Sequence, residues 1–510
     1  MNRTRGIKNA IFGILSQLLI IVVGIMIPRL VLVNLGSEAN GLLSSIGNIL
    51  AYLSLLEAGV GTATLQALYK PCAENNHPSS NSIMAATDYF YRKTGIIYLV
   101  IVLLLSACYS LFVQTDLPRL DVFAVVLLSG LTSVISFFFQ GKFKIFLAAE
   151  GKAYVNTNIA TFIQIGTSLT KAVLLAIGFG VVAVQVSGFA FNLLQMSIYA
   201  LYMNRHYPWL NMKVKPDFDA ISQKNAVLVH QISGLIFSNT DVLLLTVFTS
   251  LKEVSVYTMY AMIYGMAKML AVILYNSYTY ALGQSYNTDK TRFLRMFDAY
   301  EVMTMIITFS LYCICRLLIN PFLSLYTRGV NDIEYVNAWL PWLFAIFYLL
   351  HNGRISSSTV IDVSQHFEDT KWRSVLESII NVTVSLICVN CFGIYGVLMG
   401  TIAALLYRTN DMIIYSAGIL GRSCWITYKR WIINLVVFFG LSFALDQVPV
   451  PANDYLQLIG EAVPISILII LVFFSINLMF NRDSVLYVIQ VIKNIVKDWE
   501  KRLRKNNWSS

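Results

Sequence analysis

The chain has 510 residues, of which 57% are hydrophobic and only 13% are charged, and its mean hydropathy is +0.66. A soluble domain carries about 25% charged residues, so this composition excludes an ordinary soluble protein. The formal net charge of +10 does not require a nucleic-acid partner, because a membrane protein with many short cytoplasmic loops becomes basic for topological reasons. Apolar runs of roughly 20 residues recur along the whole length and predict a polytopic helical membrane protein.

Fourteen membrane-spanning helices are predicted, which makes the expected fold class all-α. In chain order they cover about residues 7–33, 42–68, 90–113, 121–147, 154–178, 181–204, 225–250, 254–281, 296–325, 336–362, 372–392, 394–418, 431–447 and 457–480. The first two are separated by a short predicted turn that contains Gly36 and Gly41. The second helix is expected to return across the membrane.

The basic residues are distributed unevenly between the two predicted faces of the membrane. Of the 37 Lys and Arg, 29 belong to the termini and to alternate loops, Arg408 being counted among them. Only Arg119, Lys252 and Arg328 lie in the opposite loops. Positive residues favour the cytoplasmic side, so this bias predicts that both termini are cytoplasmic and that the number of spans is even.

A spacing of small residues suggests an internal duplication. Gly180, Ala183 and Ser187 open the sixth predicted span, and Gly393, Gly396 and Gly400 open the twelfth with the same spacing. Small residues allow close helix approach, so packing alone is an alternative explanation. An offset of six spans nevertheless predicts two parallel six-helix repeats.

The predicted organisation therefore has five parts. They are an N-terminal six-helix lobe (1–204), a cytoplasmic linker (205–224), a C-terminal six-helix lobe (225–418), two additional transmembrane helices (419–480) and a basic amphipathic cytoplasmic tail (481–510). The tail is expected to lie on the anionic inner leaflet, because its apolar residues follow helical spacing and its Lys and Arg fall mostly on other faces.

Five cations fall within the predicted spans and are the main functional signal. They are Arg29, Lys171, Lys268, Arg316 and Arg354. A charge inside the membrane is costly and usually faces a partner or a wet cavity. We expect Arg29, Lys171, Lys268 and Arg354 to line one central cavity that suits a phosphate or diphosphate.

Other positions for these cations remain open at this stage. Arg316 is interpreted as snorkelling outward, and Arg29 has the same alternative. Lys171 has the alternative of pairing with an acid on a neighbouring helix. Arg354 follows Asn352-Gly353, where a helix can break.

Two embedded acids, Glu57 and Asp241, are candidates for ion coupling, because a buried carboxylate can exchange a proton or a sodium ion for cargo. Charge compensation of the cations is the rival interpretation. The seven cysteines show no metal-ligand spacing, so we expect no metal site and no cofactor. Nucleotide-binding motifs and long outer loops are absent from the sequence, which disfavours an enzyme.

Several ordered segments resemble a known family. They are Pro28-Arg29, Leu35-Gly36, Glu38, Gly41-Leu42 and Gly59-Val60-Gly61 in the first two spans, residues 148–154 between the fourth and fifth, Asp241 with residues 254–257 in the second lobe, and residues 393–401 in the twelfth span. Over about residues 5–420 the chain resembles bacterial lipid-linked oligosaccharide flippases. These are the O-antigen, capsule and exopolysaccharide transporters of the multidrug/oligosaccharidyl-lipid/polysaccharide exporter superfamily.

The resemblance implies two six-helix lobes in a MATE-like V, with two extra helices. It implies a multi-pass protein of the bacterial inner membrane that flips a polyprenyl-diphosphate-linked oligosaccharide by ion-coupled alternating access, for cell-surface polysaccharide such as lipopolysaccharide. Among the cations, Arg29, Lys268 and Arg354 would bind the diphosphate. Membrane lipids, glycosyltransferases and a polymerase are the implied partners.

Two other functions compete with this interpretation. A multidrug exporter of the same superfamily usually carries cationic cargo and favours acids in its cavity, whereas embedded cations outnumber embedded acids here. A membrane enzyme acting on lipid-linked sugars would need a long catalytic outer loop.

Overall fold

The computed structural model describes residues 3–53, 55–221, 239–364, 366–448, 450, 453–491 and 493, and all regular structure among them is helical. By packing, the chain divides into two compact units. The first unit comprises Met1–Thr258 and Thr327–Glu334, and the second comprises Met259–Tyr326 and Tyr335–Ser510. The predicted lobe, linker and tail boundaries stay a prediction.

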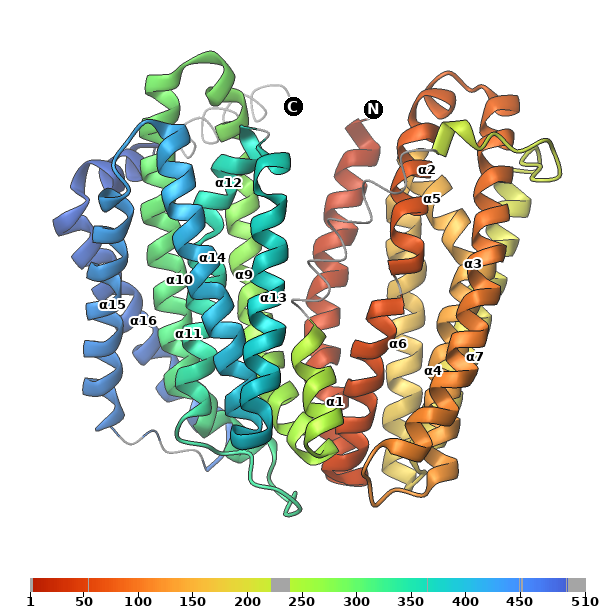
Figure 1. Ribbon diagram of the computed structural model, residues 1–510, viewed down its shortest axis with the longest axis horizontal. Coiled ribbons are helices and arrows are strands. Elements are labelled where there is room, and N and C mark those ends of the chain that lie inside the picture. The colour runs from red at the N-terminus through yellow and green to blue at the C-terminus, as the bar shows by residue number, and fades with distance from the viewer. Residues whose placement is uncertain are drawn as a thin grey trace, which may run out of the picture. The chain divides into compact units, whose positions relative to one another are not determined.

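The first unit contains the N-terminal helices (Figure 1). Its elements are α1 (Arg3–Leu53), α2 (Leu55–Ala73), α3 (His77–Phe112), α4 (Arg119–Ile135), the π-helix η1 (Ser136–Gln140), α5 (Gly141–Ala149), α6 (Ala153–Ile177), α7 (Val181–His206) and the 3-10 turn η2 (Asp219–Ile221). The helical segment Asn239–Phe248 and the first residues of α9 (Leu251–Thr288) also belong to this unit.

The expected turn between the first two spans is reduced to a single residue. Helix α1 runs through the predicted turn, and Gly36 alone is non-helical, with φ 84° and ψ 175°. A positive φ favours glycine, which has no Cβ. The carboxylate of Asp332 accepts hydrogen bonds from the Ser37 amide (2.8 Å) and the Ser37 hydroxyl (2.6 Å). This cap satisfies a backbone donor exposed by the break and lets the helix resume at once.

Beyond the break, α1 packs against residues 240–255 through a row of neutral hydrogen bonds, which we call the polar seam. It consists of three pairs, namely Asn40 Nδ2 to Ser255 Oγ (2.8 Å), Ser45 Oγ with Thr246 Oγ1 (2.7 Å) and Tyr52 Oη with Thr240 Oγ1 (2.7 Å). Gly41 lies so close to Leu251 that an added Cβ would sit 1.8 Å from the Leu251 carbonyl oxygen. The absence of a side chain at Gly41 is therefore what brings the polar pairs within reach.

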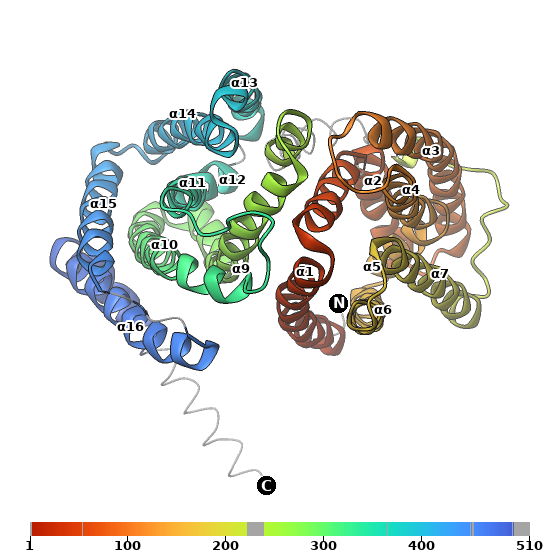
Figure 2. The ribbon, with the colours of Figure 1, turned by 90° about the horizontal axis from the view of Figure 1, so that it is seen from below.

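The second unit contains the C-terminal helices. They are the rest of α9, α10 (Lys290–Tyr326), α11 (Leu340–Gly353), α12 (Ile355–Val363), α13 (Phe367–Phe392), α14 (Ile394–Leu420), α15 (Trp425–Asp446) and α16 (Tyr455–Phe480). Figure 2 shows α15 and α16 beside α10, against which both pack. Helices α13 and α14 form an antiparallel pair joined at Gly393, whose φ is 51°.

The two small-residue stretches differ in their packing roles. In the second stretch, an added Cβ would sit 2.3 Å from the Cys388 carbonyl oxygen at Gly396 and 2.1 Å from Ser385 Oγ at Gly400. Nothing lies within 4 Å of such a Cβ at Gly180 in the first stretch. Close helix packing therefore explains the second stretch but not the opening glycine of the first.

Buried ion pairs attach α15 to the second unit. Glu301 on α10, which is 0% exposed, pairs with Arg422, just before α15, and with Arg430 in the second turn of α15. At the other end of α15, Asp446 pairs with Arg316, whose guanidinium lies 3.8 Å from the Trp342 ring centroid. The Arg316 side chain is therefore buried in an ion pair near the end of α15, and its snorkelling outward stays a prediction.

Nine helices within the described residues are long and apolar enough to cross a membrane. The predicted first, second, eighth and tenth spans fall in α1, α1 with α2, α9, and α11 with α12. Most of the predicted seventh span lies outside the described residues. The multi-pass class follows from these helices, whereas the total of fourteen stays a prediction.

The start of the predicted tail is helical over residues 482–491. Val485 and Val488 are buried within the protein, and Arg295 lies 5.1 Å from the Tyr487 ring centroid. The beginning of the tail thus packs on protein. Residues 494–510 lie outside the described part, and their location on a membrane surface stays a prediction.

We expect Gly41→Ala to destabilise the protein by about 1–3 kcal/mol, because overpacking forces neighbouring backbone apart. Gly47→Ala is the matched control on the same helix, since nothing lies within 4 Å of its added Cβ, and it should be neutral or stabilising by up to about 1 kcal/mol. Thermal unfolding of the purified protein in detergent measures both. Equal unfolding midpoints for the two variants would contradict the close approach.

Candidate functional site

The predicted cations Lys268 and Arg354 both lie in the second unit, where Lys268 contacts His351, three residues before Arg354. Lys268 projects from α9, and its Nζ lies 3.4 Å from Nε2 of His351 on α11. His351 Nδ1 lies 3.2 Å from Asn352 Oδ1, and Asn352 Nδ2 donates to the Tyr312 hydroxyl at 2.5 Å. These residues form a connected polar path through the interior of the unit.

The direction of these hydrogen bonds fixes the state of the imidazole. An ammonium can only donate, so Nε2 of His351 must accept from Lys268. Nδ1 then carries the ring proton and donates to Asn352 Oδ1, which leaves His351 neutral. Lys268 is therefore oriented by His351 without having its charge neutralised.

Lys268 differs from its basic neighbours in what it contacts. Across the described residues no carboxylate lies within ion-pair distance of Lys268 Nζ, and His351 is its hydrogen-bond partner. A half-buried ammonium without a counter-ion is electrostatically unfavourable in apolar surroundings. Such a group favours the arrival of an anion, because an anion supplies the missing partner.

Arg354 sits at a break between two helices, as its neighbours Asn352-Gly353 predicted. Helix α11 ends at Gly353 and α12 begins at Ile355. The Arg354 guanidinium donates to Glu377 on α13 at 2.6 Å, and both side chains are largely buried. The charge of Arg354 is thus paired with that of an acid, unlike the charge of Lys268.

Glu377 and Asp411 bind further arginines on α13 and α14. Arg408 lies 3.6 Å from Glu377 and 2.5 Å from Asp411, and Arg373 also pairs with Asp411. With Lys268 and Arg354, this makes four cations against two carboxylates. We call these six residues together with His351 the basic cluster, and its charged side chains leave a positive excess.

The sequence located two members of the basic cluster and missed the others. Arg408 was assigned to the cytoplasmic loops, but it is 3% exposed and lies within α14. The spacing of Arg408 and Asp411 is a helical i, i+3 pair, which was a usable signal. Nothing local links Glu377 to Arg354, because their helices meet only in the folded unit.

The first unit holds the remaining predicted site residues. Arg29 lies half-buried on α1, before the break at Gly36. Lys171 on α6 is half-buried, with its side-chain end against Gly188 of α7. The meeting of these cations with Lys268 and Arg354 in one cavity stays a prediction.

The structure describes the side chain of only one of the two embedded acids. Asp241 is 3% exposed and accepts a hydrogen bond from the Tyr257 hydroxyl at 2.7 Å. The side chain of Glu57, on α2, lies outside the described part of the structure. Within the described residues, no group of three His, Cys, Asp or Glu is placed to hold a metal ion.

Comparison with solved structures identifies proteins that share this fold. No family model matches the chain, and no curated protein matches its sequence. Lipid II flippase MurJ in an inward closed conformation superposes with a TM-score of 0.69 at 11% identity, covering 93% of this chain and 98% of that one. An inward-facing MATE family multidrug transporter of the MOP superfamily gives a TM-score of 0.65 at 14% identity, covering 81% and 98%.

The chain therefore shares the fold of these MATE and MurJ structures. The MATE multidrug transporter DinF-BH is a further match, with a TM-score of 0.57 and 13% identity over 83% of this chain and 98% of that one. The predicted all-α polytopic membrane class is confirmed. These neighbours are transporters, and at identities of 11–14% the likeness concerns the fold alone.

We expect Glu377→Gln to destabilise the protein by about 3–5 kcal/mol, because it leaves buried Arg354 and Arg408 with one carboxylate fewer. Asp369→Asn is a suitable control, since Asp369 forms an exposed pair with His366 and should change stability by less than about 0.5 kcal/mol. Thermal unfolding in detergent distinguishes the two. A Glu377→Gln variant as stable as the control would show that the arginines find other partners.

Proposed function

We propose that this protein flips polyprenyl-diphosphate-linked oligosaccharides from the cytoplasmic to the outer leaflet for cell-surface polysaccharide synthesis. The observation that carries the proposal is Lys268, a half-buried ammonium oriented by neutral His351. The positive excess of the basic cluster supports it, because a diphosphate needs cations as partners. A fold shared with a lipid II flippase is compatible with cargo of this chemistry.

The energetic argument concerns the desolvation of the cargo head group. Moving a diphosphate unaided through hydrocarbon would cost many kcal/mol, because its charges lose their water. Lys268 can replace part of that water with charge-assisted hydrogen bonds. Arg354, already paired with Glu377, contributes to the local positive potential.

A candidate residue for ion coupling is proposed by similar reasoning. Asp241 is a buried carboxylate with a hydroxyl donor, and a group of that kind can exchange a proton or a sodium ion as its surroundings change. We propose Asp241 as the coupling residue, with Glu57 as a second candidate. No cofactor is required, and the ion gradient would drive alternating access.

The proposed setting is the bacterial inner membrane, with both termini in the cytoplasm. The cargo would be assembled on the cytoplasmic face and used on the outer face, so glycosyltransferases and a polymerase are the proposed partners. Multidrug export is the second candidate, favoured by the MATE family transporters among the structural neighbours. The positive excess of the basic cluster argues against cationic cargo, because like charges repel.

A flipping assay tests the cargo and the role of Lys268 together. The protein is reconstituted in vesicles that carry a labelled polyprenyl-diphosphate sugar in one leaflet. We expect Lys268→Met to reduce transport on the order of tenfold or more, because a charge-assisted hydrogen bond is lost, while Lys268→Arg retains most of it. The thermal stability of Lys268→Met should equal or exceed that of the unaltered protein, since an uncompensated charge has been removed.

Lys290→Met, at an exposed position at the start of α10, is the control and should flip normally. Normal transport by Lys268→Met would show that this lysine does not guide the anion. If the unaltered protein moves no lipid-linked sugar but exports a cationic dye, the protein is a drug exporter and the proposal is wrong.

A further inference from the structure

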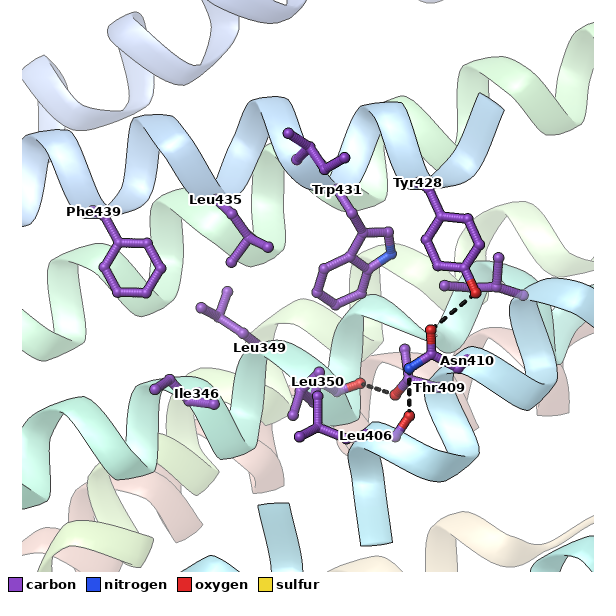
Figure 3. Close-up of a pocket in the computed structure, with 12 residues that line it drawn as sticks. Ile346, Leu349, Leu350, Leu406, Thr409, Asn410, Tyr428, Trp431, Leu435 and Phe439 are labelled. Carbon is purple, nitrogen blue, oxygen red and sulfur yellow. Dashed lines mark hydrogen bonds between the residues drawn. The ribbon is translucent and has the colours of Figure 1, made fainter. Parts of the chain in front are cut away.

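A groove of about 300 Å³ lies between α11, α14 and α15 of the second unit. Most of its wall is apolar, with Leu349, Leu350, Leu435 and Phe439 among the lining residues (Figure 3). The polar side chains in the wall gather at one end, where Asn410 and Tyr428 lie together (Figure 3). The groove therefore has a polar end and an apolar end, like one chain of a lipid.

The polar end is built from neutral groups with hydrogen-bonding capacity to spare. The Tyr428 hydroxyl donates to Asn410 Oδ1 at 2.9 Å, and Asn410 Nδ2 donates to the Leu406 carbonyl at 2.7 Å. A primary amide has two N–H groups, so Asn410 keeps a second donor. These contacts hold the amide in a fixed orientation.

Trp431 supplies a second donor in the wall of the groove. The residue is 6% exposed, and its indole Nε1 is buried without a hydrogen-bond partner. Figure 3 shows this nitrogen on the side of the ring toward Tyr428 and Asn410. A buried N–H without an acceptor is unfavourable, and it marks a position where an acceptor from outside the chain would be stabilised.

The groove extends along α15, one of the candidate membrane spans. Tyr428 lies in the first turn of α15 (Trp425–Asp446), and Phe439 lies 11 residues further along the same helix. At a rise of 1.5 Å per residue the two are about 16 Å apart along the axis. The polar end thus lies near a helix terminus, where membranes place lipid esters, and the apolar end lies toward the hydrocarbon interior.

We propose that this groove binds one acyl chain of a membrane phospholipid, whose ester carbonyl accepts hydrogen bonds from Trp431 Nε1 and the Asn410 amide. An ester carbonyl is a neutral acceptor and matches neutral donors. A polyprenyl diphosphate has no ester carbonyl, and its diphosphate would require cations. The arginines flanking this end of α15, Arg422 and Arg430, are already paired with Glu301 and Asp298.

A lipid in this groove would act on the basic cluster through one layer of packing. An added Cβ at Gly353 would lie 2.4 Å from the Trp431 ring, so this ring closes directly over the end of α11. Arg354 is the next residue, at the break between α11 and α12. A bound acyl chain therefore supports the ring that covers this break, and this role does not depend on which cargo the protein carries.

The test compares two phospholipids that differ only in the ester. Thermal unfolding of the full-length protein in detergent is followed while a diester phosphatidylcholine, or its diether analogue with equal chains, is added. We expect the diester lipid to stabilise the unaltered protein at a concentration roughly five- to tenfold lower, because the ether lacks the carbonyl acceptor. In Trp431→Phe this difference should fall below about twofold, whereas Trp425→Phe, an exposed control on the same helix, should keep it.

A second variant tests the groove without touching its donors. Ile432 lines the groove and is 52% exposed, so Ile432→Trp should fill the mouth without disturbing the core and should remove stabilisation by both lipids. Equal stabilisation by diester and diether lipids in the unaltered protein would overturn the proposal. So would stabilisation by polyprenyl phosphate at lower concentrations than the diester lipid, blocked by Ile432→Trp, because the groove would then hold the cargo tail. Neither result changes the outcome of the flipping assay.

Discussion

The pairing of buried charge is the constraint on which the second unit depends. Arg408 is 3% exposed and bridges Glu377 on α13 and Asp411 on its own helix, and Glu301 is 0% exposed between Arg422 and Arg430. A buried charge that loses its partner is strongly destabilising, although a buried pair adds little net stability over an apolar one. The pairs therefore specify which helices must lie together, while apolar packing supplies most of the stability.

Lys268 differs from these charged residues because its partner is not a carboxylate. Its partner is His351, and the hydrogen bonds that continue to Asn352 and Tyr312 keep the imidazole neutral. Arg316, Arg354 and Arg408 are thus paired with acids, whereas a neutral acceptor holds Lys268.

Two kinds of polar contact join helices in this protein. The polar seam of the first unit joins hydroxyl and amide groups, as in the pair formed by Asn40 and Ser255. Neutral interhelical hydrogen bonds in a membrane contribute about 0.6 kcal/mol on average, so such contacts separate at modest cost. Ion pairs such as that of Arg354 with Glu377 are far more costly to separate in apolar surroundings. Contacts of the first kind suit helices that exchange partners, and those of the second suit helices that stay together.

The glycines show how local and tertiary information combine. The sequence marked Gly36 and Gly41 as a turn, but α1 continues and breaks only at Gly36, where Asp332 from a distant loop caps Ser37. Gly41 is instead a packing position against Leu251. A glycine in the sequence indicates that either a turn or a close helix approach is possible. The residues that pack against it in the folded protein determine which of the two it forms.

Hydropathy and spacing by themselves determined the all-α membrane class, the approximate helix positions, the break before Arg354 and the embedded positions of Lys268 and Arg354. These properties depend on length and polarity within one segment, so they can be read locally. Only the tertiary structure decided that Arg354 is paired by Glu377, that Arg316 and Arg408 are buried in ion pairs, and that His351 orients Lys268. Most of these partners lie on different helices, with no fixed sequence separation. The energetic effect of each charge depends on the groups that the folded chain places within a few ångströms of it.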